Sequence, residues 1–105
     1  MGQKQDHKIW RKQFNEKCLK RDGNKCRFCS ETENLEVHHI TSRKTIPNAG
    51  YTESNGITLC QKHHWMAEQF HMTGESLPGF SPDELYREIS SSYEKAYEDS
   101  LNLNR

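Results

Sequence analysis

Residues 35–40 read LEVHHI and place two neighbouring histidines, His38 and His39, on a short apolar segment. The alternation along this segment is typical of a β-strand, in which successive side chains point to opposite faces. His38 and His39 are therefore expected on opposite faces, where they cannot serve the same purpose. Residues 57–59, ITL, predict a short second strand, and a helix is expected from Gln61 to about His71.

Two pairs of potential metal ligands flank these strands. Cys26 and Cys29 form a CxxC pair, and Cys60 and His63 form a second pair at the same spacing. Two such pairs complete the closed tetrahedral coordination of structural Zn²⁺, for which three cysteines and one histidine are a permitted ligand set. His64 is the alternative fourth ligand, and the two-residue spacing favours His63.

Helices are expected on both sides of the strands. Apolar residues recur at helical spacing from about residue 8 to residue 21, between lysines and arginines. A second helix is expected over about 82–98, because Ser81 is a favourable N-cap, Pro82 suits the first turn and Glu84 can complete a capping box. A polar loop, residues 41–56, joins the two strands, and so long a loop in a small domain is usually functional or disordered.

Composition favours one small metal-stabilised domain over residues 1–105. Of the 105 residues, 31% are hydrophobic and 29% charged, and the mean hydropathy is −1.10. A chain this short and polar builds a thin core, and such domains often recruit disulfides or metals. No apolar run approaches the ~20 residues that span a bilayer, and no signal peptide is recognisable. A cytoplasmic, reducing setting without membrane attachment follows as the expectation, and there closely spaced cysteines are more often metal ligands.

The formal net charge of zero hides an asymmetry along the chain. Residues 1–46 contain eleven lysines or arginines against six acidic residues, and residues 47–105 contain four against nine. A basic front is compatible with a nucleic-acid footprint on one face. Solvated helix faces are the competing explanation.

Taken together, several separate elements resemble the HNH endonuclease family. They are Cys26-x-x-Cys29, His38-His39-Ile40, Asn55, Leu59-Cys60 and His63-His64, and the resemblance covers roughly residues 8–72. It implies an α+β fold with a small ββα-metal (His-Me finger) core over about residues 26–72 and a structural zinc site, and the two helices expected from apolar spacing would frame this core at its ends. The family's frequent second CxxC is Cys60-x-x-His63 here, which keeps zinc binding plausible.

The resemblance also implies roles for individual residues. His39 resembles the general base that activates water, and His38 and His64 resemble ligands of one catalytic divalent cation, Mg²⁺, Mn²⁺ or a similar ion. Asn55 resembles the central asparagine of the motif, which fixes the loop and the base or in some members binds the cation. Histidine suits a base at neutral pH, because its ordinary pKa is about 6.5.

Further side chains near these residues have open roles. Glu68 and His71 lie one and two helical turns beyond His64, where each could reach the cation or lie on the helix surface. Arg43 and Lys44 follow the base and are candidates for phosphate contacts, although a solvated loop explains them equally well.

The resulting hypothesis is a metal-dependent endonuclease that hydrolyses DNA. The alternatives are a non-catalytic zinc module that binds nucleic acid or protein, and a subunit of a larger nuclease. Because one active site cuts one strand at a time, double-strand cleavage would call for a dimer, and the terminal helices are the expected dimer contact. Small proteins that resemble this one are common in phages and in bacterial mobile or defence systems, so a bacterial or phage-infected cell is the expected setting.

Overall fold

The computed structural model describes the backbone of residues 3–104 and the side chains of residues 7–103, so the ends of the predicted 1–105 domain lie outside the described residues. The main elements, in chain order, are α1 (Gln3–Arg21), β1 (Glu36–His39), β2 (Gly56–Leu59), α2 (Gln61–Thr73), α3 (Pro82–Glu88) and α4 (Tyr93–Leu101). Short 3₁₀ turns are η1 (Pro47–Gly50), η2 (Glu53–Asn55) and η3 (Asn102–Asn104). The chain has the expected α+β fold, and its β1-β2-α2 unit is a ββα core.

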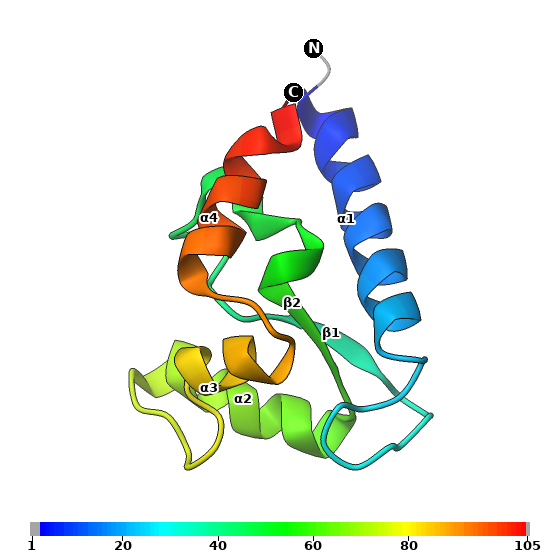
Figure 1. Ribbon diagram of the computed structural model, residues 1–105, viewed down its shortest axis with the longest axis vertical. Coiled ribbons are helices and arrows are strands. Elements are labelled where there is room, and N and C mark those ends of the chain that lie inside the picture. Colours follow the sequence, from blue (N-terminus) through cyan, green and yellow to red (C-terminus); the bar gives the residue numbers. More distant parts are fainter. Residues whose placement is uncertain (1–2, 105) are drawn as a thin grey trace.

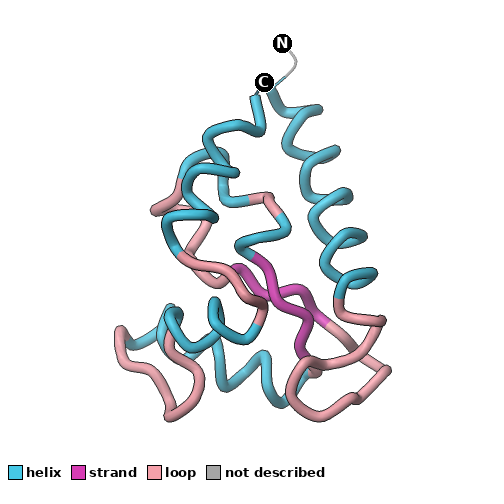
Figure 2. The backbone as a smooth tube through the Cα atoms, viewed as in Figure 1, coloured by secondary structure: helices cyan, strands magenta, loops and turns pink. Residues whose placement is uncertain are grey.

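The two strands form an antiparallel pair near the middle of the molecule (Figure 2), with His38 opposite Ile57 and His39 opposite Gly56. Helix α1 runs along one side of the sheet (Figure 1), and α2 packs on the side away from α1, with α3 and α4 beside it. Both sheet faces are therefore covered, which is why every residue of β2 is buried.

Side-chain alternation on β2 sorts the core into two clusters. Gly56 and Thr58 point toward α1, where the Thr58 hydroxyl donates to the backbone carbonyl of Cys18. A Cβ at Gly56 would lie 2.6 Å from the Cys18 Sγ, so glycine is needed for the close approach of helix and strand. On the α1 side, the cluster consists of Phe14, Cys18 and Tyr51. Ile57 and Leu59 enter the larger cluster, which also includes Ile40, Ile46, Ala67, Phe80, Leu85, Tyr86 and Ala96.

The single helix predicted over 82–98 is wrong in one respect, because the structure has two helices there. Helix α3 starts as expected, with the complete capping box of Ser81 and Glu84, but it ends at Glu88. Ser90 has a φ of +56°, which breaks the helical path. The Ser92 hydroxyl then accepts from the Lys95 N–H at 3.1 Å and caps α4. Serines 90–92 compete with helical backbone hydrogen bonds and favour a cap.

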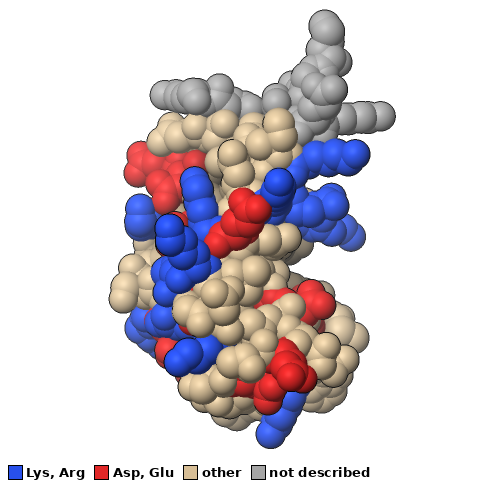
Figure 3. Space-filling model, turned by 90° about the vertical axis from the view of Figure 1, so that its right-hand side faces the viewer, with Lys and Arg blue, Asp and Glu red and all other residues tan. Residues whose placement is uncertain are grey.

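The loop between the strands is folded rather than shapeless. It contains η1 and η2, with left-handed backbone at Asn48, Ala49 and Gly50. Over residues 3–104, no helix is both long enough and apolar enough to cross a bilayer. Lysine and arginine side chains predominate on the upper half of the side that α1 forms (Figure 3), in agreement with the basic first part of the sequence.

Candidate metal sites and active-site cleft

Four side chains from two segments of the chain meet at one end of the sheet and form a zinc cluster, Cys26, Cys29, Cys60 and His63, whose ligand atoms all lie within 4.8 Å of one another. The His63 Nδ1 lies 3.4 Å from the Cys26 Sγ and 3.2 Å from the Cys60 Sγ, and the Cys29 and Cys60 sulfurs are 3.7 Å apart. Tetrahedral zinc bonds of about 2.3 Å to sulfur and 2.0 Å to nitrogen place ligand atoms about 3.5–3.8 Å apart. The cluster therefore fits Zn²⁺.

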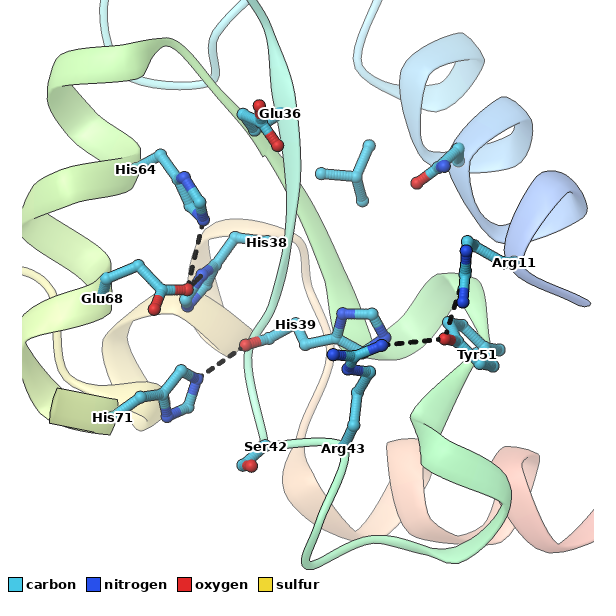
Figure 4. A pocket seen from close by; sticks show the side chains of 12 residues that line it. Arg11, Glu36, His38, His39, Ser42, Arg43, Tyr51, His64, Glu68 and His71 are labelled. Carbon is cyan, nitrogen blue, oxygen red and sulfur yellow. Dashed lines mark hydrogen bonds and ion pairs between the residues drawn. The ribbon is translucent and has the colours of Figure 1, made fainter. Parts of the chain in front are cut away.

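A second group of ligands, the cation cluster, forms where β1 faces α2. It consists of His38, His64 and Glu68, whose ligand atoms also lie within 4.8 Å of one another. Oε2 of Glu68 is 3.2 Å from the His38 Nδ1 and 3.2 Å from the His64 Nε2 (Figure 4). His64 and Glu68 share a face of α2 because they are four residues apart.

His38 has the properties of a metal ligand. Its side chain is 1% exposed, and Nδ1 has no hydrogen-bond partner among the described residues, because the approach of Glu68 lacks hydrogen-bond geometry. Burial, followed by the nearby His64, His71 and His39, lowers the pKa of His38 to about 2. Its imidazole is therefore neutral, and a neutral imidazole nitrogen beside a carboxylate oxygen is a pair of ligands that a divalent cation would join.

His39 lies on the opposite face of β1, as strand alternation predicts. Its ring stacks on Phe14 at a centroid distance of 4.5 Å and meets the edge of Tyr51 at 5.2 Å. Burial, then Arg43, His71 and Arg11, lower the pKa of His39 to about 4. The imidazole is thus neutral near pH 7 and able to accept a proton.

Both faces of β1 open into one cleft of about 390 Å³. The cation cluster lies at one side of β1 and His39 at the other, and both line this cleft (Figure 4). The cleft is lined by Arg11, Asn15, Glu36, Val37, His38, His39, Ser42, Arg43, Tyr51, His64, Glu68 and His71.

A comparison of the sequence with models of known protein families found a match. The family model for the HNH endonuclease matches residues 16–67, a span that contains the zinc cluster, both strands and the first half of α2. The chain belongs to the HNH endonuclease family. Neither the comparison with curated proteins nor that with solved structures found a match.

Asn55 of the HNH domain lies beside the cleft rather than in it. Its side chain is completely buried, and its Oδ1 accepts from the Thr41 N–H at 2.9 Å and from the Tyr86 hydroxyl at 2.7 Å. Its Nδ2 donates to the carbonyls of Thr41 and Gly50. All four hydrogen-bonding positions of the amide are filled. Of the two roles that the resemblance implied, this geometry supports fixing the loop and not binding the cation.

The HNH domain separates the two basic residues that follow β1. Arg43 lines the cleft on the His39 side, whereas Lys44 lines a neighbouring groove with Phe70. His71 contacts both histidines of β1, since its Nε2 donates to the His39 carbonyl at 2.9 Å and its ring stacks on His38.

The sequence left the role of Glu68 open and did not place Tyr51 or Arg11 at the predicted HNH site, although all three line the cleft. The i, i+4 spacing from His64 is a usable signal for Glu68, which reaches the cation cluster directly. Tyr51 belongs to the long loop and Arg11 to α1, and no sequence spacing connects either to β1.

Proposed function

We propose that the chain is a metal-dependent endonuclease that hydrolyses DNA phosphodiester bonds. The observation that carries the proposal is the arrangement of different side chains on the two faces of β1. Three metal-binding side chains converge on one face, a neutral histidine occupies the other, and both open into one cleft. A domain that only needs zinc for folding has no use for the second cluster.

His38, His64 and Glu68 would hold the catalytic cation. Mg²⁺ or Mn²⁺ there would supply positive charge to the scissile phosphate and to the leaving oxygen. The mixed nitrogen and oxygen ligands are compatible with Mn²⁺ and similar ions, and carboxylate oxygen also suits Mg²⁺. The zinc cluster, at the start of the same helix, would hold the fold.

His39 is the proposed general base, which takes a proton from the attacking water. Phe14 and Tyr51 pack its ring from two directions, and His71 holds its backbone carbonyl, so the imidazole has a fixed orientation. A base that is neutral and held in place meets the two requirements for proton abstraction, which are protonation state and geometry.

The test is nicking of supercoiled plasmid DNA by zinc-loaded protein with Mg²⁺ or Mn²⁺. We expect His39→Ala to reduce the rate by about 10²-fold or more, the range for a lost general base. His7→Ala is the matched control, because His7 is exposed and is the histidine outside the zinc cluster and the cleft.

Each alternative has its own outcome. Metal-dependent nicking that survives His39→Ala removes His39 as the base. Folded, zinc-loaded protein that fails to cut with any divalent cation is a non-catalytic binding module, and protein that cuts only with a partner is a subunit of a larger nuclease. A homodimer through the terminal helices stays a prediction, for which the exposed Tyr93, Tyr97 and Leu101 of α4 are the apolar surface.

A further inference from the structure

Three hydrogen-bonding side chains from separate parts of the chain meet on the His39 side of the cleft. Arg11 comes from α1, Arg43 from the loop after β1, and Tyr51 from the segment between η1 and η2. The Tyr51 hydroxyl oxygen accepts from the Arg11 Nε at 3.4 Å and from an Arg43 guanidinium nitrogen at 3.2 Å. Figure 4 shows both arginines directed at this one oxygen.

Among the side chains that the structure describes, the two guanidinium groups have no counterion of their own. Among the described side chains, neither Arg11 nor Arg43 forms an ion pair, although Glu36 and Glu68 line the same cleft. Arg21 and Arg27, by contrast, both pair with the buried Asp22. Two like charges held at one hydroxyl repel each other, and an anion between them relieves that repulsion.

The Tyr51 hydroxyl also keeps a hydrogen to donate. A phenol has one donor and can accept two hydrogen bonds. Both of the observed bonds are accepted, and no acceptor for its O–H is present among the described residues. Tyr51 is 4% exposed and lines the cleft, so its hydroxyl hydrogen is available to a ligand in the cleft and has little contact with solvent.

Charge and donor geometry together define the ligand. Guanidinium groups bind phosphate oxygens through paired, charge-assisted hydrogen bonds, and a hydroxyl adds a third donor. The cation cluster lies on the opposite face of β1, so these donors form a site separate from it. We propose that Arg11, Arg43 and Tyr51 form a phosphate subsite that holds a backbone phosphate of the bound strand beside His39. The identity of the ligand rests on the proposed function, because it takes the substrate to be nucleic acid.

Binding without cleavage tests the subsite. Fluorescence anisotropy measures the affinity of zinc-loaded protein for a short labelled DNA duplex, with no Mg²⁺ or Mn²⁺ added, at several salt concentrations. We expect Arg11→Ala and Arg43→Ala each to weaken binding about tenfold or more, the loss of one charge-assisted contact. Each should also reduce the slope of log K against log salt by about 0.9.

Two further variants separate the subsite from general charge and from folding. Arg87→Ala removes the same charge from an exposed position on α3 outside the cleft, and is expected to leave the affinity and the salt slope close to wild type. Tyr51→Phe keeps the ring that packs on Phe14 and His39, so it should fold normally, weaken binding and leave the salt slope unchanged. Thermal unfolding of all four variants checks the fold.

The outcomes distinguish the subsite from the nuclease proposal. The subsite is overturned if Arg11→Ala and Arg43→Ala bind the duplex as Arg87→Ala does. In that case, His39-dependent nicking can still be observed, and the nuclease proposal stands. The subsite is also overturned if the wild type does not bind the duplex. If the arginine variants lose affinity and salt slope as expected but the wild type never cuts, the nuclease proposal fails and the subsite stands.

Discussion

At the residue scale, each pair of adjacent histidines contributes one side chain to each of two tasks. On β1, alternation sends His38 to the cation cluster and His39 to the other face of the strand. On α2, successive residues are about 100° apart around the axis, so His63 joins the zinc cluster and His64 the cation cluster. Two different backbone geometries thus separate neighbours that look equivalent in sequence.

Glu68 had two possible roles in the sequence, and the structure places it in the cation cluster, so its substitution tests that cluster. We expect Glu68→Gln to weaken Mn²⁺ binding, measured by calorimetry on zinc-loaded protein, by at least the roughly 10–100-fold seen when a supporting group of a metal site is lost. The reason is that the neutral amide removes the one anionic oxygen of the cluster. Glu75→Gln, exposed and outside the cleft, is the matched control. Unchanged Mn²⁺ affinity in Glu68→Gln would exclude this carboxylate as a ligand.

At the element scale, α2 is the part that links folding to chemistry. The helix starts at a zinc ligand, since the Cys60 sulfur accepts from the His63 N–H at its N-terminus. The residue after His63 is His64, and Glu68 follows one helical turn further on; both belong to the cation cluster. A displacement at the zinc cluster would therefore move the cation cluster as well.

The loop before β2 depends on a glycine that keeps Asn55 in place. Gly50 has a φ of +64°, and a Cβ there would lie 2.5 Å from the Asn55 Nδ2 and 2.7 Å from the Ile46 Cγ2. We expect Gly50→Ala to lower the free energy of unfolding by about 2–4 kcal/mol, through left-handed strain and overpacking together. Urea unfolding measures the change.

Gly74→Ala provides the matched comparison for Gly50→Ala. Gly74 ends α2 with a φ of +84°, but a Cβ there meets nothing within 4 Å. Its substitution should cost only the backbone strain, about 1–2 kcal/mol. Equal losses for the two variants would mean that crowding against Asn55 contributes nothing.

At the scale of the whole molecule, a zinc ion held by the zinc cluster would compensate for a small, divided core. The apolar interior consists of two clusters on opposite sides of a two-stranded sheet. A structural zinc ion contributes on the order of 10 kcal/mol of apparent binding free energy, comparable with the whole stability of a small domain. We therefore expect a zinc chelator to unfold the chain, with loss of its near-ultraviolet circular dichroism.

Two cysteine variants distinguish zinc binding from packing. Cys29 is exposed, so Cys29→Ser removes a ligand without opening the core, and the variant should bind zinc weakly and melt at a temperature that chelation hardly changes. Cys18 is buried outside the cluster, so Cys18→Ser should lose packing stability yet keep one zinc per chain. Full zinc occupancy in Cys29→Ser would contradict the assignment.

The elements whose signals are local were the easiest to predict. The cap at Ser81, the strand at residues 57–59 and the helix after Cys60 are all present, because each depends on neighbours within a few residues. The single helix over 82–98 was wrong because Ser90–Ser92 end one helix and cap another, and the apolar spacing continues through the break. The spacing of apolar residues alone does not reveal a residue with left-handed backbone.

Sequence by itself determined the HNH family, the ββα order and the two zinc-spaced pairs, because strand alternation and helix pitch follow from local backbone geometry. Only the tertiary structure decided that Glu68 completes the cation cluster and that the side chain of Asn55 holds the loop through its hydrogen bonds. It also decided that Arg11, Arg43 and Tyr51 meet beside His39. Those contacts join residues separated by up to 40 positions, and they form only when α1 and the folded loop pack against β1. The doubled histidine at the centre of the chain fixes where the chemistry lies, and packing supplies the groups around it.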